Sequence, residues 1–284
     1  MTDTRSLQRT LFRMQADATF ARDVFAGSAE ALATTDLGSQ DLTLLCALDP
    51  AGVSADPFEK RRTQLLGNLA TEFLLTLAAA NRSGEHEDLL ETFPRSREFH
   101  AAVRRGDRLP FAFAHHARRR LEELSDHGGA QAALAVLELE ESLARLRRES
   151  AIEARLELAS GFVQLAPTSR ILDLPRGTLG WCDELQASLE NGEPLARAPQ
   201  GLGAGREAAL LCVVPTERRA PRALLEVRAE LLEPPADELL RLTERPFGPD
   251  ERLDYARRRG VALEELEAFL HDFVVEGVLL ARGA

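Results

Sequence analysis

Histidine and cysteine are the residues of this chain best suited to metal or nucleophilic chemistry, and their spacing supports neither. His115 and His116 are adjacent, so on a helix their side chains diverge by about 100° and cannot both ligate one ion without help from elsewhere. Cys182 precedes Asp183, whose negative charge disfavours the thiolate that a nucleophilic cysteine needs. The sequence also lacks a nucleophile elbow and a phosphate-binding loop. We therefore expect a chain that is not an enzyme and that itself holds no metal or other cofactor.

The composition narrows the function classes further. The 284 residues carry a formal net charge of -11, and such a chain is poorly suited to coat nucleic acid or an anionic membrane, since both attract a cationic surface. The cysteines Cys46, Cys182 and Cys212 form no CxxC pair, which is typical of small buried residues in a reducing compartment. The first residues lack the continuous apolar segment of a signal peptide. These features predict a cytoplasmic protein with two domains and no membrane contact.

The first half of the chain has helical periodicity, because apolar residues recur at steps of three and four. One helix is expected over residues 6–25 and another over residues 56–80. Further helices are expected over 96–106, 109–129 and 130–149, the last with heptad-like apolar spacing. This pattern predicts a helical partner or docking domain over residues 1–150.

The pattern changes after residue 150. Short β-leaning stretches, "GFVQLAP", "SRILDLP", "AALLCVVP" and "ALLEVRAELL", are separated by segments rich in glycine and proline. The helical stretches "PPADELLRLTER", "GPDERLDYARRRG" and "ALEELEAFLHDFVVEG" follow, and the chain then closes on a short apolar end. We expect an α+β protein in which a linker and a small winged-helix-like domain occupy residues 151–284.

DNA recognition by this winged helix is unattractive on physical grounds. Phosphate contacts require arginine or lysine, yet the segment from Val261 to Leu280 contains no arginine or lysine. Its charged residues include Glu264, Glu265 and Glu267. The chain is expected to have no nucleic-acid partner.

The same module is suited to peptide capture by strand addition, in which an exposed edge strand and a neighbouring helix form the groove. We expect the strand over residues 222–232 and the helix beside it to hold the peptide. The candidate residues are Leu224, Leu225, Glu226, Val227 and Arg228 on the strand, and Leu266, Phe269, Leu270 and Phe273 on the helix. The alternative is that the apolar members are core residues that pack strand on helix.

A second candidate surface is an arginine-rich stretch over residues 100–120, which contrasts with the acidic chain around it. Arginine and aromatic residues are those that most often anchor protein interfaces. The candidate partner-docking residues are Arg104, Arg105, Arg108, Phe111, Phe113, Arg118 and Arg119. The alternative is a solvated basic face balanced by acidic helices nearby.

Two resemblances give these patterns a context. "ALLEVRAELLEPPADELLRL" and "GVALEELEAFLHDFVVEGVLL" resemble the PqqD-like precursor-recognition element of ribosomal peptide natural-product (RiPP) pathways, a small sheet with three helices that docks a leader peptide. "FEKRRTQLLGNLATEFLLTLAAA", "FPRSREFHAAV" and "LAVLELEESLARLRRE" resemble the partner proteins encoded beside multinuclear non-haem iron oxidative enzymes, a group that includes the methanobactin-type partner. In those systems a TIM-barrel enzyme carries the iron and modifies cysteine in a precursor peptide, while the partner binds both.

The resemblance implies a non-catalytic partner subunit that presents a ribosomally made precursor peptide to a separate iron-dependent enzyme. The iron is then expected in the partner enzyme, in a heterodimer with this chain. The alternative is a transcriptional or signalling regulator that uses a C-terminal winged helix for protein or ligand contacts.

Overall fold

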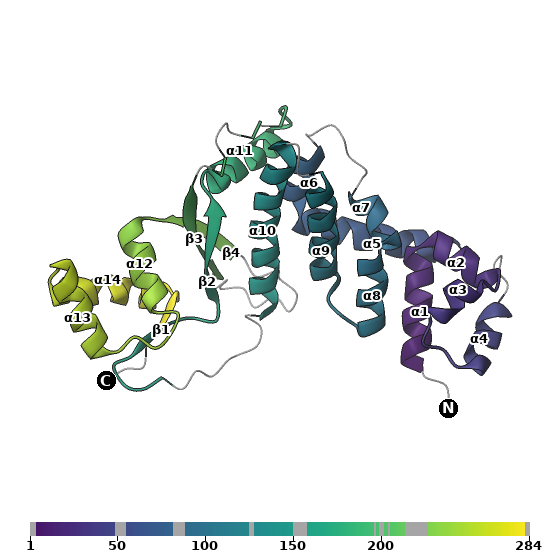
Figure 1. Cartoon of the computed structure of the whole chain (residues 1–284), viewed down its shortest axis with the longest axis horizontal. Coiled ribbons are helices and arrows are strands. Elements are labelled where there is room, and N and C mark those ends of the chain that lie inside the picture. The colour runs from purple at the N-terminus through teal and green to yellow at the C-terminus, as the bar shows by residue number, and fades with distance from the viewer. Residues whose placement is uncertain are drawn as a thin grey trace. The chain divides into compact units, whose positions relative to one another are not determined.

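The computed structural model describes residues 4–48, 55–81, 89–124, 128–149, 158–195, 197–198, 202–203, 205–213 and 227–281 of the chain. The chain divides into two compact units, whose elements are labelled in Figure 1. The first unit comprises Met1–Glu141 and Ser188–Arg197, and the second comprises Ser142–Ala187 and Ala198–Ala284. The first unit is helical and the second holds the described strands. The expected α+β class, with a helical region before a strand-containing region, is confirmed.

The first unit is built from helices that follow one another closely in sequence. In chain order they are α1 (Thr4–Ala16), α2 (Ala18–Phe25), α3 (Ala29–Ala33), α4 (Ser39–Cys46), α5 (Ala55–Glu72), α6 (Leu74–Asn81), α7 (Leu89–Thr92), the 3-10 helix η1 (Phe93–Arg95), α8 (Arg97–Arg105), α9 (Leu109–Glu123) and the first part of α10 (Gly128–Glu149).

The single helix expected over residues 6–25 is two helices, so that prediction was wrong. The chain breaks at Asp17, whose backbone is extended and whose carboxylate accepts the amide protons of Thr19 and Phe20. This carboxylate caps α2 and satisfies amides that have no partner within the helix. The apolar stripe continues across the break, and periodicity alone therefore does not reveal it.

The helix expected over residues 56–80 is also interrupted, at Phe73 between α5 and α6. The buried carboxylate of Glu140, from α10, accepts the amide protons of Leu75 and Thr76 at 2.9 and 2.8 Å. A carboxylate at the start of a helix is favoured by the helix dipole as well as by these hydrogen bonds. The break therefore depends on a residue 64 or 65 positions away in the chain.

Fully buried phenylalanines form part of the core of this unit. The rings of Phe73 and Phe113 are 5.0 Å apart, those of Phe93 and Phe113 are 5.3 Å apart, and those of Phe93 and Phe99 are 5.4 Å apart. Burying such a ring contributes about 1.5–3 kcal/mol relative to leaving it exposed. These contacts bring the junction of α5 and α6 together with η1, α8 and α9.

A buried arginine links α1 to α8. Arg13 donates from Nε to His100 Nδ1 at 2.9 Å and from Nη1 to the Thr34 carbonyl at 2.7 Å. Since His100 Nδ1 accepts this bond, the ring proton lies on Nε2, which is 3.2 Å from the Asp17 carboxylate. Burial, followed by the nearby charge of Arg104, lowers the pKa of Arg13 to about 10. This network therefore fixes α8 to α1 and places the positive charge of Arg13 near that of Arg104 on α8.

The second unit contains the strands and the last helices. In chain order its elements are β1 (Val163–Leu165), β2 (Ser169–Pro175), the first part of α11 (Thr178–Asn191), β3 (Arg206–Val213), β4 (Val227–Leu232), α12 (Pro234–Leu242), α13 (Pro249–Arg259), α14 (Leu263–Val275) and β5 (Leu279–Ala281).

The main sheet of this unit is antiparallel, with the order β2-β3-β4. Its register places Leu210 of β3 opposite Ile171 of β2 and Glu230 of β4. β5 pairs with β1 in a separate antiparallel ladder, in which Gln164 lies opposite Leu280. The apolar end of the chain thus returns beside the first strand.

The helices α12, α13 and α14 gather on one side of this sheet (Figure 1). They share one buried cluster with the sheet, in which Leu210 of β3 packs with Leu240, Tyr255 and Leu270 of the three helices. Leu232 of β4 lies at the edge of this cluster. Strand β4 and α14 are therefore parts of one packed module.

Helix α11 was not predicted from the sequence. Its first turn is capped from a distant strand, since the carboxylate of Glu207 on β3 accepts the amide protons of Gly177 and Leu179 at 2.8 and 2.9 Å. The helix buries Trp181 and Leu185. A cap supplied 28 to 30 residues downstream is invisible to any local sequence window.

Candidate functional site

The arginine-rich stretch surrounds a hollow between α8 and α9, which we call the arginine groove. It is open to solvent, with a volume of about 950 Å³. The arginines that line it are Arg97, Arg104, Arg105, Arg108, Arg118 and Arg119. The carboxylates among its described lining residues are Glu98, Asp107 and Glu122, so arginine outnumbers them two to one. The groove is a cationic surface on an acidic chain.

The turn between α8 and α9 positions these arginines. Ser96 caps the start of α8 by accepting the amide proton of Phe99 at 3.1 Å. The helix ends at Gly106, whose φ of 77° lies in the left-handed region that glycine favours. A Cβ at Gly106 would lie only 2.9 Å from Arg9 Nη2. The tight turn sets Arg108 between the last turn of α8 and the first turn of α9.

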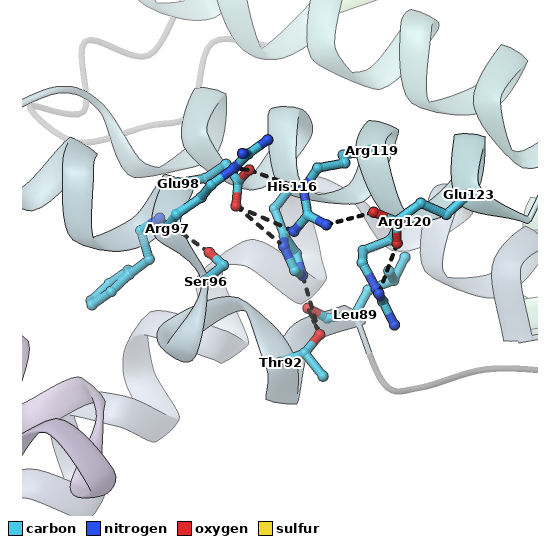
Figure 2. A network of polar contacts seen from close by, with 10 residues as sticks. Leu89, Thr92, Ser96, Arg97, Glu98, His116, Arg119, Arg120 and Glu123 are labelled. Carbon is cyan, nitrogen blue, oxygen red and sulfur yellow. Dashed lines mark hydrogen bonds and ion pairs between the residues drawn. The ribbon is translucent and has the colours of Figure 1, made fainter.

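A carboxylate network forms one wall of the arginine groove (Figure 2). Glu98 Oε1 accepts hydrogen bonds from Arg97 Nε at 2.9 Å and Arg119 Nε at 3.1 Å. Burial alone would raise the pKa of Glu98, but the hydrogen bonds from Arg97 and Arg119 outweigh it and lower the pKa to about 2. Glu98 is therefore ionised at neutral pH and orients Arg119, which also donates to Glu123 at 2.7 Å.

His116 lies buried behind this wall, where Figure 2 shows it between Thr92 and Glu98. Its Nε2 is 3.1 Å from Thr92 Oγ1, and its Nδ1 is 3.8 Å from Glu98 Oε2, with no hydrogen-bond partner among the described residues. Burial is the largest influence on the pKa of His116 and lowers it; the Glu98 charge raises it, and Arg119 and Arg120 lower it. The imidazole is therefore neutral in the folded protein at neutral pH.

The adjacent histidines point to different environments, as expected. His115 is exposed and lines the arginine groove, whereas His116 is only 2% exposed. Sequence reasoning missed Arg97, Glu98 and the contact of Thr92 with His116. No local spacing signals them, because α8 and α9 supply the two sides of the network.

The arginines of the groove differ in how far they are already paired. Arg105 Nε contacts Asp107 at 2.7 Å and Arg118 Nη2 contacts Glu141 at 2.8 Å, while Arg119 belongs to the Glu98 network. Arg104 and Arg108 are exposed, and their side chains make no ion pair or hydrogen bond within the described part of the chain. These two guanidinium groups retain their full capacity to bind an anion.

The two aromatic residues of the stretch have different positions. Phe111 is half-buried and lines the arginine groove. Phe113 is fully buried between Phe73 and Phe93, so the structure places it in the core and away from any docking partner. The alternation along α9 explains the difference, since residues two positions apart on a helix face nearly opposite directions.

Strand β4 presents a free edge, and the register identifies which of its amides face outward. Val213 of β3 donates to the Thr168 carbonyl beside β2, so its amide faces away from β4. Peptide groups alternate in direction along a strand, and the residues of β3 that face β4 are therefore Cys212, Leu210 and Ala208. Their partners on β4 are Arg228, Glu230 and Leu232.

The intervening residues of β4 are Val227, Ala229 and Leu231, and the same alternation directs their amides and carbonyls to the open side. No described strand pairs with β4 on that side. Leu231 is 56% exposed. The edge thus offers an extended peptide the pattern of donors and acceptors needed for antiparallel or parallel addition.

Helix α14 divides into a buried face and an exposed face. Leu266 and Leu270 are 5% and 1% exposed and belong to the core, so the structure favours the packing interpretation for these two. Phe269 is 38% exposed, and its ring lies 4.9 Å from that of half-buried Phe273 in an edge-on arrangement. Val275 is 72% exposed. Phe269 and Val275 are therefore the exposed large apolar side chains of this helix, whereas Phe273 also packs against the core cluster.

The strand candidates are only partly described. Leu224, Leu225 and Glu226 lie outside the described residues, and Val227 is described by its backbone alone. Arg228 is exposed and donates to Glu230 at 2.9 Å. The structure therefore tests the expected strand from Val227 onward.

The charge at this edge is mainly negative. Burial, followed by the charge of Glu230, raises the pKa of the Cys212 thiol, and Arg228 and Glu276 also act on it. Charges from β4 and from the end of α14 thus meet near Cys212. Glu276, the C-cap residue of α14, is exposed. The environment is suited to a basic peptide.

The described residues contain no group of three or more histidine, cysteine or acidic residues arranged to hold a metal ion. Cys182 is buried, as expected, whereas Cys46 on the short helix α4 is exposed, which corrects the expectation that it is buried. Within the same residues, no helix combines the length and apolarity needed to span a membrane.

Comparison with known proteins adds no family to this picture. The chain matches no protein-family model and no curated protein sequence.

Proposed function

We propose that this chain is the non-catalytic partner subunit of a separate iron-dependent modifying enzyme in RiPP biosynthesis. In this proposal the second unit binds a ribosomally made precursor peptide, and the first unit docks the enzyme through the arginine groove. The iron belongs to the TIM-barrel partner, and the heterodimer works in the cytoplasm. The proposal rests on the sequence resemblances together with two surfaces of different chemistry.

The observation that carries the proposal is the open edge of β4, in a module whose helix α14 also leaves apolar side chains exposed. Peptide capture by strand addition needs unpaired backbone groups for affinity and a neighbouring groove for side-chain specificity. Val227, Ala229 and Leu231 supply the first requirement. We propose that the aromatic pair Phe269 and Phe273 on α14 contributes to the second. A leader segment with basic residues flanking an apolar one fits the acidic surroundings of this edge.

A single proline provides the test. Ala229→Pro removes one outward amide and leaves the bonds of Arg228 and Glu230 to β3 in place, because proline is tolerated on the free side of an edge strand. We expect a loss of precursor affinity of about tenfold or more, equivalent to about 1.4 kcal/mol. Ala229→Ser keeps the amide and is the matched control, for which near wild-type affinity is expected.

The assay is a titration of labelled short peptides, taken from the open reading frames that flank the gene, with circular dichroism as the folding control. If Ala229→Pro unfolds, Leu231→Pro removes another outward amide and replaces it. Unchanged peptide affinity in a folded proline variant would contradict binding at β4.

A further inference from the structure

We infer that the arginine groove binds an acidic, amphipathic polypeptide segment, with Arg104 and Arg108 as its main anchors. This deepens the proposed docking role of the first unit, on which it rests, by naming the chemistry of the partner segment. The proposal concerns the first unit alone.

The first step is the charge pattern of the groove. The side chains of Arg104 and Arg108 are exposed and unpaired within the described part of the chain, and both line the groove, one from the last turn of α8 and one from the turn that follows. Arg104 is also near buried Arg13, whose pKa it helps to lower. Each guanidinium group can donate two parallel hydrogen bonds to one carboxylate in a bidentate arrangement.

The second step is the apolar part of the lining. Ala101, Ala102, Phe111 and Ala112 line the same hollow as the arginines. Interfaces commonly combine an apolar centre with a charged rim. A segment that alternates acidic and apolar residues would satisfy both parts, whereas a small anion would leave the apolar lining exposed.

The third step is the extent of the surface. A second hollow of about 630 Å³ meets the arginine groove at Gly106 and Asp107. Its lining adds Arg9 and Arg61, together with apolar Phe12 and other side chains of α1. A continuous surface of this size suits a polypeptide segment better than a single compact ligand.

The acidic residues of the groove and the net charge of the chain disfavour a nucleic acid as the occupant. Glu98, Asp107 and Glu122 are interspersed among the arginines and would repel an unbroken row of phosphates. The net charge of -11 would also oppose the approach of a polyanion. Discrete carboxylates on a flexible segment can avoid the acidic positions of the groove.

The test uses the full chain and a labelled synthetic peptide in which glutamate alternates with leucine. The control peptide carries glutamine in place of glutamate. We expect the acidic peptide to bind with an affinity that falls as salt is raised, and the control to bind at least about tenfold more weakly.

The matched variants are Arg104→Gln/Arg108→Gln and Arg22→Gln/Arg95→Gln, which remove the same charge from exposed positions of the first unit inside and outside the groove. The groove variant should lose about tenfold or more in affinity for the acidic peptide, and the outside variant should not. Equal affinity in both variants, or no binding of the acidic peptide to the wild type, would overturn the inference.

Two further outcomes would assign the groove to another occupant and also overturn it. One is tighter binding of poly-uridine RNA than of the acidic peptide, again lost in Arg104→Gln/Arg108→Gln. The other is a wild-type dimer in size-exclusion chromatography that becomes monomeric in the same variant, since the occupant would then be a second copy of the chain.

The two proposals can fail separately. Ala229→Pro should retain acidic-peptide binding, because β4 belongs to the second unit. If the acidic peptide binds the groove while a proline at β4 leaves precursor binding unchanged, strand addition fails and the groove inference stands. If a proline at β4 weakens precursor binding while the acidic peptide does not bind the groove, strand addition stands and the groove inference fails.

Discussion

Replacing Glu98 with glutamine should destabilise the first unit in a pH-dependent way. The variant keeps the shape of the side chain and removes the charge that holds Arg97 and Arg119. The pKa of Glu98 is lowered from an ordinary value of 4.5 to about 2, which corresponds to an upper limit of about 3 kcal/mol. Arg97 is 80% exposed, and solvent screening reduces the expected loss at pH 7 to about 1–2 kcal/mol.

The direction of the pH effect follows from linkage. Because the pKa of Glu98 is lower in the folded chain than in the unfolded chain, its contribution is complete above about pH 4.5. The contribution is lost as the pH falls toward about 2, since the unfolded chain then binds the proton more strongly. The difference in unfolding free energy between wild type and Glu98→Gln should therefore shrink between pH 7 and pH 3.

Urea denaturation followed by circular dichroism measures this difference at each pH. Glu122→Gln is the control, because Glu122 is an exposed carboxylate of the same groove and its side chain makes no hydrogen bond or ion pair among the described residues. Its replacement should change the unfolding free energy by less than about 0.5 kcal/mol. A Glu98→Gln variant as stable as wild type at pH 7, or equally destabilised at pH 7 and pH 3, would refute the reasoning.

Two other substitutions test neighbouring parts of the account. His116→Gln should reduce the loss of stability that occurs as the pH falls below about 6.5, because the lowered pKa of His116 makes the unfolded chain the better proton acceptor. Denaturation at pH 7 and pH 5 measures this effect, with His115→Gln as the control. An unchanged pH dependence in His116→Gln would count against it. Glu207→Ala should lower the free energy of unfolding by about 1 kcal/mol, because α11 loses its cap. The control Asp183→Ala, at an exposed position of α11, should not lower it. Thermal unfolding compares the two variants, and equal melting temperatures would show that the cap does not stabilise the protein.

The fold was predictable where local signals agree. The strand stretch "SRILDLP" coincides with β2, and the helix expected over residues 96–106 corresponds to α8, which has a capping serine and a terminal glycine. The break at Asp17 carried a readable capping signal, but the continuous apolar stripe around it favoured one long helix. In such a case the capping residue is the better guide.

Other features depend on contacts between distant residues. Helix α11 receives its cap from Glu207, and the start of α6 receives its cap from Glu140. The arginine groove also depends on contacts between residues that are distant in sequence. Its arginines were evident from the sequence, but the core position of Phe113 and the role of Glu98 depend on how α8 packs against α9.

The direction in which the amides of β4 point could not be predicted from the sequence either. Sequence alternation identified the strand, whereas the outward direction of its amides followed from a single hydrogen bond, between Val213 and Thr168, combined with the register. A one-residue shift in register would reverse the two sets of amides. No property of the β4 sequence alone fixes that choice.

Amide hydrogen exchange on the second unit tests the central claim, strand addition at β4, most directly. Without peptide, the amides of Arg228 and Glu230 should exchange slowly, because they bond to β3, and the amide of Ala229 should exchange rapidly. A saturating precursor peptide should slow exchange at Ala229 and Leu231 strongly and leave Arg228 and Glu230 little changed. Unaltered exchange at Ala229 and Leu231 in the peptide-saturated protein would contradict it.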